Sequence, residues 1–285
     1  MAQGERSPGR TWAGEGIGRG IDPGGMRLAG QVALVTGAGE GIGRGIATAF
    51  AREGADLALC DLNAEALEGT RAAVTGFGRR TLARQVDVRD AVAVEAFVNE
   101  TARTFGRLDV LVNNAAIMPV APLETMSESA IDQVLQVNLR GPILFSKYAI
   151  PHLRRAGGGS ILHMASVTGH NGFAGVVVYG ATKGALLALA RGQAIELAKD
   201  NIRVNTVSPG TVDAPMLHHF LREHARDPQK ARLAFDRLHP RGRVATIDEV
   251  AAVFVFLASG EAANITGTDL CCDGGFTAQG LQPRE

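Results

Sequence analysis

Two side chains near the middle of the chain could move a proton together. Tyr179 and Lys183 are four residues apart, so in a helix they lie on the same face, one turn apart. A free tyrosine titrates at about 10, which is too high for an efficient base at neutral pH. A neighbouring ammonium favours the phenolate and lowers this pKa. Because a carbinol carbon gives up hydride only as its hydroxyl loses a proton, the pair predicts acid/base help to hydride transfer.

A serine adds a third group to this pair. Ser166 follows an apolar run and lies thirteen residues before Tyr179, where its hydroxyl could hold a substrate oxygen and stabilise developing charge. The tyrosine–lysine spacing alone arises often by chance, and the alternative is an ordinary pair on a helix surface. Tyr148, the only other tyrosine, has His152 in the fourth place and illustrates that alternative. The position of Ser166 favours catalysis.

A glycine-rich turn predicts a phosphate site. The segment TGAGEGIG, residues 36–43, follows the apolar run at 32–36 and opens a helical stretch that continues to Arg52. Glycines permit a tight turn and close approach of backbone to a pyrophosphate, while the helix N-terminus offers unpaired N–H groups. A similar segment at 14–21 follows no strand and lacks this context.

An acid at the end of the second apolar run indicates which dinucleotide binds. Asp61 closes the run at 56–61, about 20 residues after the glycines. A carboxylate there accepts hydrogen bonds from ribose hydroxyls and repels a 2′-phosphate, and the turn itself carries Glu40 rather than a basic residue. We therefore expect NAD. The alternative for Asp61 is a helix cap on a surface loop.

The elements that must position these groups alternate along the chain. Near-continuous apolar strands that alternate with helices favour a parallel sheet covered on both faces. The expected fold is α/β, a single-domain Rossmann-type doubly wound parallel sheet of about seven strands with helices on both faces. Helices are expected at 64–74, 92–105, 128–154, 178–199 and 247–257, and strands at 32–36, 56–61, 81–88, 110–113, 160–165, 203–208 and 269–272.

Further motifs occur in order along the same elements. They are Asp87-Val88, Asn113-Asn114-Ala115-Ala116, Asn138 within VNLRG, Pro209-Gly210 and Asp273-Gly274-Gly275. Together with the glycine turn, Ser166 and the tyrosine–lysine pair, they resemble the short-chain dehydrogenase/reductase family, in its subgroup of about 250 residues, and the match covers residues 28–278.

The resemblance assigns roles to individual residues. It implies catalysis by Asn138, Ser166, Tyr179 and Lys183, with Asn138 supporting a water that leads protons away from Lys183 and Lys183 bonding the nicotinamide ribose. It implies that the cofactor is bound by Gly37, Gly41, Ile42, Gly43, Asp61, Leu62, Asp87, Val88, Asn114, Tyr179, Lys183, Pro209, Gly210 and Val212.

Two positions depart from the family pattern. Ala116 replaces the last glycine of the family's NNAG and adds a methyl near the nicotinamide, for which we expect a minor effect. Ala214 stands where the family often has a threonine that contacts the carboxamide. Thr211 or a backbone group could take over this contact, and cofactor affinity is the property concerned.

The predicted function is an NAD(H)-dependent oxidoreductase that interconverts a secondary alcohol and a ketone, with Tyr179 as acid/base. Two alternatives are an NADP-dependent carbonyl reductase and a non-catalytic dinucleotide-binding sensor. Asp61 discriminates against the first, and the complete catalytic set argues against the second, since a sensor without turnover should have lost one of these residues.

Composition limits the partners. Lysine plus arginine and aspartate plus glutamate each number 29, so no charge excess favours nucleic acid or an anionic membrane. No stretch has the length of a membrane span and no signal core precedes the domain, so we expect a cytoplasmic protein. Cys60, Cys271 and Cys272 lie in apolar runs without CxxC spacing, which predicts buried strand positions and no metal site. The partner is a small alcohol or carbonyl compound, and the resemblance implies a homotetramer.

The remaining expectations concern segments. Residues 1–26 are rich in glycine and arginine and lack periodicity, so we expect a disordered extension before a domain at 27–285. A substrate lid is expected at about 211–240, with its histidines on a solvated helix rather than on a metal: His218, His219 and His224. His170 could bond a polar substrate or lie on the surface. An apolar pocket is expected from Phe173, Val176, Val177 and Met216.

Overall fold

Seven parallel strands form the central layer of the computed structural model, in which residues 25–280 are described. Their order is β3-β2-β1-β4-β5-β6-β7, and every neighbouring pair is parallel. The order reverses between β1 and β4, where the carboxyl ends of an open parallel sheet leave a crevice for ligands. The strands are β1 Val32–Thr36, β2 Asp56–Asp61, β3 Thr81–Gln85, β4 Val110–Asn113, β5 Gly159–Met164, β6 Ile202–Pro209 and β7 Asp269–Cys272.

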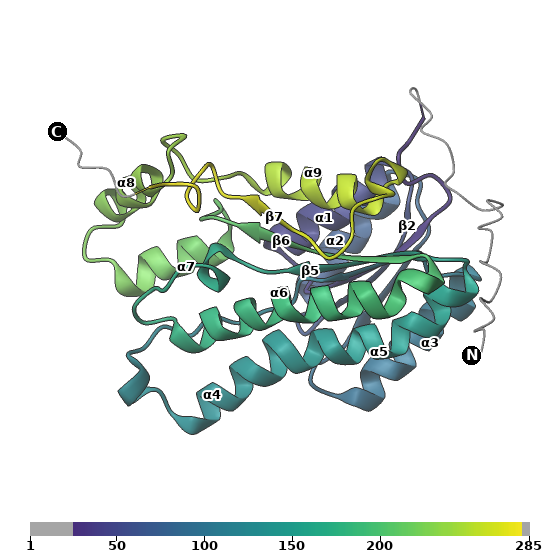
Figure 1. Ribbon diagram of the computed structural model, residues 1–285, viewed down its shortest axis with the longest axis horizontal. Coiled ribbons are helices and arrows are strands. Elements are labelled where there is room, and N and C mark those ends of the chain that lie inside the picture. The colour runs from purple at the N-terminus through teal and green to yellow at the C-terminus, as the bar shows by residue number, and fades with distance from the viewer. Residues whose placement is uncertain (1–24, 281–285) are drawn as a thin grey trace, which may run out of the picture.

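Helices cover both faces of the sheet. Their bounds are α1 Gly41–Arg52, α2 Ala64–Gly76, α3 Ala91–Phe105, α4 Glu128–Leu135, α5 Gly141–Arg155, α6 Val177–Leu197, α7 Pro215–His224, α8 Pro228–Leu238 and α9 Ile247–Ala258. One buried apolar cluster joins the sheet to α1, α2 and α9, and a second joins it to α3, α5 and α6. In Figure 1, α9 and α1 lie above the strands and α5 and α6 below them. The expected doubly wound fold is confirmed.

The position of a strand in the sheet decides how deeply its side chains are buried. All five residues of β1 are buried, because this strand has neighbours on both edges and helices on both faces. In the part of the chain that the structure describes, the last strand, β7, pairs with β6 alone. Cys60 in β2 is buried as expected, but Cys271 in β7 is exposed, so the expectation of three buried cysteines is wrong at the sheet edge. All three are free thiols.

The helix expected at 128–154 is interrupted. A π-helical turn, Gln136–Arg140, separates α4 from α5. Pro142 lacks the N–H that would continue an ordinary helical ladder. The N–H of Gly141 instead reaches five residues back, to the carbonyl of Gln136. This widened turn carries Asn138, and such turns are frequent at functional sites.

The segment after β6, for which the sequence predicts a lid with a solvated helix, contains two helices. Residues 211–240, which lack a clear apolar period, contain the two helices α7 and α8. Each helix begins with a proline at its first turn, Pro215 or Pro228, and Asp227 caps α8 through the N–H groups of Gln229 and Lys230. These two helices lie at the left of Figure 1. Of the disordered extension expected at 1–26, all but the last two residues lie outside the described ones.

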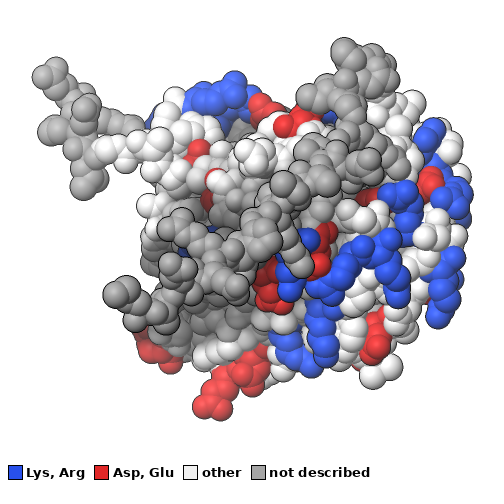
Figure 2. Space-filling model, turned by 45° about the vertical axis from the view of Figure 1, so that its right-hand side comes forward, with Lys and Arg blue, Asp and Glu red and all other residues white. Residues whose placement is uncertain are grey.

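Surface charges of both signs lie close together. Arginines pair with acids over β2, β3 and the neighbouring helices, as in Arg80–Asp56 at 2.7 Å and Arg84–Glu100 at 2.6 Å. Figure 2 shows one face on which basic and acidic side chains are interspersed. Within residues 25–280, no helix combines the length and apolar character needed to cross a lipid bilayer.

Candidate active site

Ser166 and Tyr179 meet at the carboxyl end of β5. Ser166 stands two residues beyond the end of this strand, and Tyr179 lies in the first turn of α6. Their side chains face each other closely enough for Ser166 to influence the Tyr179 phenol, and both are at least nine-tenths buried. The Ser166 hydroxyl also accepts the N–H of Thr168 at 3.2 Å, which fixes the start of the following loop. Ser166 and Tyr179, which are thirteen residues apart in the sequence, therefore lie together in the fold, as expected.

Lys183 lies one helical turn beyond Tyr179 and is 2% exposed. Its Nζ donates to the backbone carbonyl of Met164 at 2.6 Å. The same atom lies 5.3 Å from the centre of the Tyr179 ring. The ammonium is thus held between the end of β5 and the phenol, as the tyrosine–lysine spacing predicts.

The titration of this pair differs from the expectation. Burial raises the pKa of Tyr179 to about 12, although Ser166 acts in the opposite direction. Burial lowers the pKa of Lys183 to about 7. Removal from water disfavours the charged form of each group, and this effect is larger than the mutual attraction of a phenolate and an ammonium. The expected lowering of the tyrosine pKa is therefore not produced by the protein groups alone.

Asn138 is buried on the π-helical turn and is fully engaged by the backbone. Its Oδ1 accepts the N–H of Ile117 at 2.9 Å, and its Nδ2 donates to the carbonyl of Ile117 at 2.8 Å. Its Nδ2 also lies 3.4 Å from the hydroxyl of Thr182, the residue before Lys183. The side chain therefore ties the loop after β4 to the helix that carries the tyrosine and the lysine.

The glycine turn between β1 and α1 is closed by contacts that exclude larger side chains. A Cβ at Gly43 would lie 1.9 Å from the carbonyl oxygen of Gly37, whose own φ is +62°. Asn114, at the end of β4, donates from Nδ2 to the carbonyls of Thr36 and Gly37. Among residues 25–280, no side chain caps the N-terminus of α1 at Glu40, so its first N–H groups remain available to an anion. These features fit the pyrophosphate of a dinucleotide.

Asp61 joins the end of β2 to this turn. Its Oδ2 accepts the N–H of Gly39 at 2.8 Å, and its Oδ1 accepts the N–H of Asn63 at 2.9 Å. The cap of α2 is Asn63, which accepts the N–H of Ala66. The alternative role of Asp61 as a helix cap is therefore wrong. Its carboxylate lies beside the glycines.

Comparison with known proteins decides the family. Residues 37–277 match the family described as enoyl-(acyl carrier protein) reductase. The chain is 41% identical to D-threitol dehydrogenase of Mycolicibacterium smegmatis over 252 residues, which cover 88% of this chain and 95% of the relative. It is 37% identical to galactitol 2-dehydrogenase of Agrobacterium fabrum, covering 88% and 98%. A solved levodione reductase superimposes with a TM-score of 0.85 at 34% identity, covering 88% of this chain and 99% of that one.

The chain belongs to the short-chain dehydrogenase/reductase family. Membership makes it an oxidoreductase that uses a nicotinamide dinucleotide. The resemblance drawn from the ordered motifs is confirmed. In this dehydrogenase/reductase most of the motifs follow the carboxyl ends of strands, while Asn138 lies on the π-helical turn and the tyrosine–lysine pair on α6.

The remaining expected cofactor residues of the dehydrogenase/reductase lie along this edge. Asp87 pairs with Arg89 at 2.6 Å, and the guanidinium lowers the pKa of the carboxyl group. Leu62 is 60% exposed and follows β2. Gly210 donates its N–H to Cys272 at 3.2 Å, immediately after Pro209 ends β6. The other positions are Gly41 and Ile42 at the start of α1, Val88 after β3, and Val212 bridged to Ala245.

A buried histidine that the sequence analysis did not single out supports the end of β6. The Nε2 atom of His239 accepts the N–H of Thr211 at 3.0 Å, and its Nδ1 donates to the carbonyl of Phe235 at 2.8 Å. It thereby joins the end of α8 to the segment expected to hold the nicotinamide. Ala214 begins α7 without a side-chain cap. No local sequence pattern marks His239, since its partners depend on how α8 returns to the sheet.

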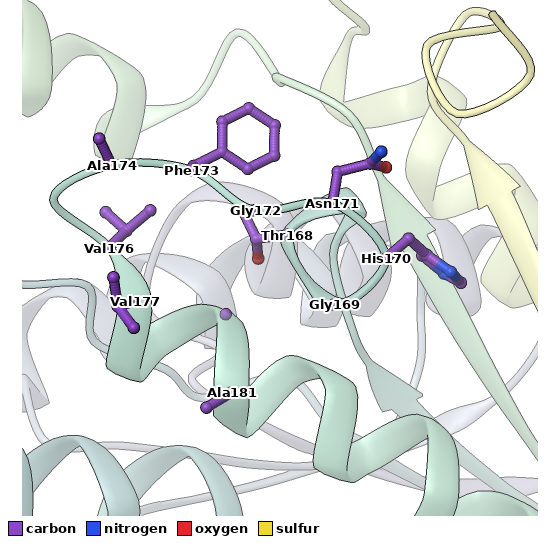
Figure 3. A pocket seen from close by; sticks show the side chains of 11 residues that line it. Thr168, Gly169, His170, Asn171, Gly172, Phe173, Ala174, Val176, Val177 and Ala181 are labelled. Atoms are coloured by element: carbon purple, nitrogen blue, oxygen red, sulfur yellow. The ribbon is translucent and has the colours of Figure 1, made fainter. Parts of the chain in front are cut away.

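A cavity of about 540 Å³ lies beside the N-terminal part of α6. Phe173, Val176 and Val177 line it as expected, but Met216 does not. Figure 3 shows the loop at 168–176 arching over this cavity, with Ala181 on its floor. Neither Ser166 nor Tyr179 lines it, so it borders α6 without containing these two side chains.

The four histidines singled out from the sequence lie on the surface. His218, His219 and His224 are exposed on α7, in agreement with the expected solvated helix, and His218 pairs with Asp213 at 2.7 Å. His170 is exposed and bonds to Asp269 of β7 at 2.8 Å. Its surface position is confirmed, and because it also lines the cavity, its bond to a polar substrate stays a prediction.

Proposed function

We propose that this chain is an NAD(H)-dependent oxidoreductase that interconverts a secondary alcohol and a ketone, with Tyr179 as acid/base. The observation that carries the proposal is the buried contact of Ser166 with Tyr179, beside Lys183 and at the same sheet edge as the glycine turn. Asp61 supports NAD, because its carboxylate lies beside the glycines and would repel a 2′-phosphate.

Each side chain has one task in the proposed reaction. A bound nicotinamide ring supplies the hydride acceptor or donor, and its positive oxidised form favours the Tyr179 phenolate. The Tyr179 oxygen takes the hydroxyl proton of the alcohol, or returns it to the ketone oxygen in reduction. Ser166 donates a hydrogen bond to the same substrate oxygen. Lys183 stays close to the phenol through its bond to Met164, and Asn138 supports the water that carries protons away.

The names of the relatives suggest where to look for the substrate. Threitol and galactitol dehydrogenases act on polyols by name, and a meso-2,3-butanediol dehydrogenase of Serratia marcescens, 38% identical over 262 residues, acts on a diol by name. We therefore infer that small vicinal diols and polyols are the first class to test.

A substrate panel with both dinucleotides tests the proposed function. Tetritols, hexitols, 2,3-butanediol and cyclic hydroxy compounds are mixed with NAD⁺ or NADP⁺, and reduced nicotinamide is followed by absorbance. The proposal expects turnover of at least one secondary alcohol and a higher kcat/KM with NAD⁺. Turnover only with NADP⁺ would favour the carbonyl reductase alternative. Dinucleotide binding without turnover of any alcohol or ketone in the panel would favour the sensor.

The quaternary state, the compartment and the lid belong to the same proposal. The homotetramer is proposed from the family resemblance. Light scattering should then give the mass of four 29.8-kDa chains.

The three free cysteines are consistent with a cytoplasmic protein. Residues 211–240 serve as the substrate lid, and limited proteolysis there should slow when NADH binds.

A further inference from the structure

Three side chains that can bind a metal ion meet beside the last strand, outside the set assigned to catalysis. His170 follows the short helical turn after Ser166, while Asp269 and Cys271 lie on β7. One donor atom from each lies within 4.8 Å of the other two. The histidine and the aspartate are 99 residues apart, so no local spacing in the sequence could indicate the cluster.

The aspartate carboxylate is oriented by two hydroxyl groups of the neighbouring strand. Its Oδ1 accepts from Thr206 Oγ1 at 2.5 Å and from Ser208 Oγ at 2.9 Å. Its Oδ2 faces His170 Nε2 at 2.8 Å and Cys271 Sγ at 3.5 Å. Hydroxyls that hold a ligand in place are typical of the outer shell of metal sites. Oδ2 is thus fixed between an imidazole and a thiol.

The donor set and its dimensions suit zinc. Zinc binds imidazole nitrogen, carboxylate oxygen and thiolate sulfur at about 2.0, 2.1 and 2.3 Å, so tetrahedral geometry separates oxygen from nitrogen by roughly 3.3 Å and oxygen from sulfur by roughly 3.5 Å. The sulfur–oxygen distance here, 3.5 Å, already has this value. His170 must withdraw by about half an ångström. Its side chain is 33% exposed, and Figure 3 shows it directed away from Val176 and Val177.

We propose that His170, Asp269 and Cys271 form a Zn²⁺ site. On binding, the Cys271 thiol loses its proton to solvent. The proton that His170 Nε2 donates to Asp269 in the free protein also leaves to solvent, and Nδ1 takes up one proton in exchange, so that Nε2 binds the ion. A water completes four ligands, because the histidine and the cysteine are both exposed. The ion ties the loop after Ser166 to β7. This proposal does not depend on the proposed reaction, and its readouts are metal binding and thermal stability.

The chain contains matched controls for the two reactive side chains. His218 and Asp213 form a histidine–aspartate pair at 2.7 Å with similar geometry but lie on the lid segment. Cys272 is the neighbour of Cys271 and packs toward the core cluster of α1 and α9, on the opposite face of β7. If His170 and Asp269 were only a hydrogen-bonded pair, replacing His170 should change metal binding no more than replacing His218. If the metal bound to any thiol, replacing Cys272 should weaken binding as much as replacing Cys271.

The test measures Zn²⁺ and Co²⁺ binding to the untagged full chain after chelator treatment. Calorimetry with Zn²⁺ should show one ion per chain in the wild type, in Cys272→Ser and in His218→Ala. Affinity should fall at least roughly tenfold in Cys271→Ser and in His170→Ala. With Co²⁺, a thiolate charge-transfer band should appear in the wild type and in Cys272→Ser but not in Cys271→Ser. Zn²⁺ should raise Tm by several degrees only where the site is intact.

Three results would overturn the proposal. They are the absence of Zn²⁺ binding to the wild type, binding that is unchanged in both Cys271→Ser and His170→Ala, and binding that is lost in His218→Ala. Circular dichroism shows whether each variant is folded, and Asp269→Asn provides a third ligand variant of nearly unchanged volume. None of these results bears on alcohol turnover, so failure here leaves the proposed reaction to its own test.

Discussion

Replacing the buried lysine by methionine should change how stability depends on pH. Burial lowers the pKa of Lys183 from 10.5 to about 7. Between these values the unfolded lysine keeps its proton and the folded one loses it, so the unfolded state binds more protons and stability rises with pH. Each pH unit contributes about 1.36 kcal/mol, which gives about 3 kcal/mol between pH 7 and 9.5. Lys183→Met lacks this contribution.

The assay is urea unfolding of wild type and variant without dinucleotide, at equal chain concentration, at several pH values in this interval. The unfolding free energy of the wild type minus that of Lys183→Met should increase by about 3 kcal/mol from pH 7 to 9.5. Lys147, which is exposed on α5, provides the matched control variant Lys147→Met for removal of a lysine outside the core. A difference in unfolding free energy that is independent of pH for Lys183→Met would refute the argument that burial lowers the pKa of this lysine.

Three further predictions concern residues at the sheet edge where the cofactor is expected to bind. Asp61→Ala should reduce the ratio of kcat/KM for NAD⁺ to that for NADP⁺ by tenfold or more, about 1.4 kcal/mol, and an unchanged ratio would remove the basis for expecting NAD. Gly43→Ala should abolish NADH binding measured by fluorescence, because the new Cβ would lie 1.9 Å from the Gly37 oxygen; binding at wild-type affinity would contradict the packing. Ala214→Thr should cap α7, raise the unfolding free energy by about 1 kcal/mol and lower the Kd for NADH, whereas loss of stability would show that this N-terminus is not short of a cap.

Local sequence patterns predicted the elements whose burial is set by periodicity. The strands at 32–36, 56–61, 110–113 and 269–272 have the bounds that their apolar runs indicated. Ser166, Tyr179 and Lys183 were predictable for a similar reason, because strand ends meet at one edge of a parallel sheet and a four-residue spacing follows one helix face.

Properties that depend on tertiary surroundings were not predictable in this way. The pKa of Tyr179 is raised by burial, whereas the sequence predicts that it is lowered. The sequence indicates the charged neighbour but not the depth of burial, which outweighs it. The sequence around Cys271 is as apolar as that around Cys60, yet Cys271 is exposed because it lies on an edge strand. His170 reaches Asp269 only because the loop after β5 folds back over the corner of β6 and β7.

The acid/base role of the phenol is tested most directly by Tyr179→Phe, which removes one oxygen atom and preserves the ring. On an alcohol identified by the substrate panel, kcat should fall by about 10³-fold or more, while the Kd for NADH stays within about twofold of the wild-type value. Turnover at the wild-type rate by a folded Tyr179→Phe variant would contradict the mechanism.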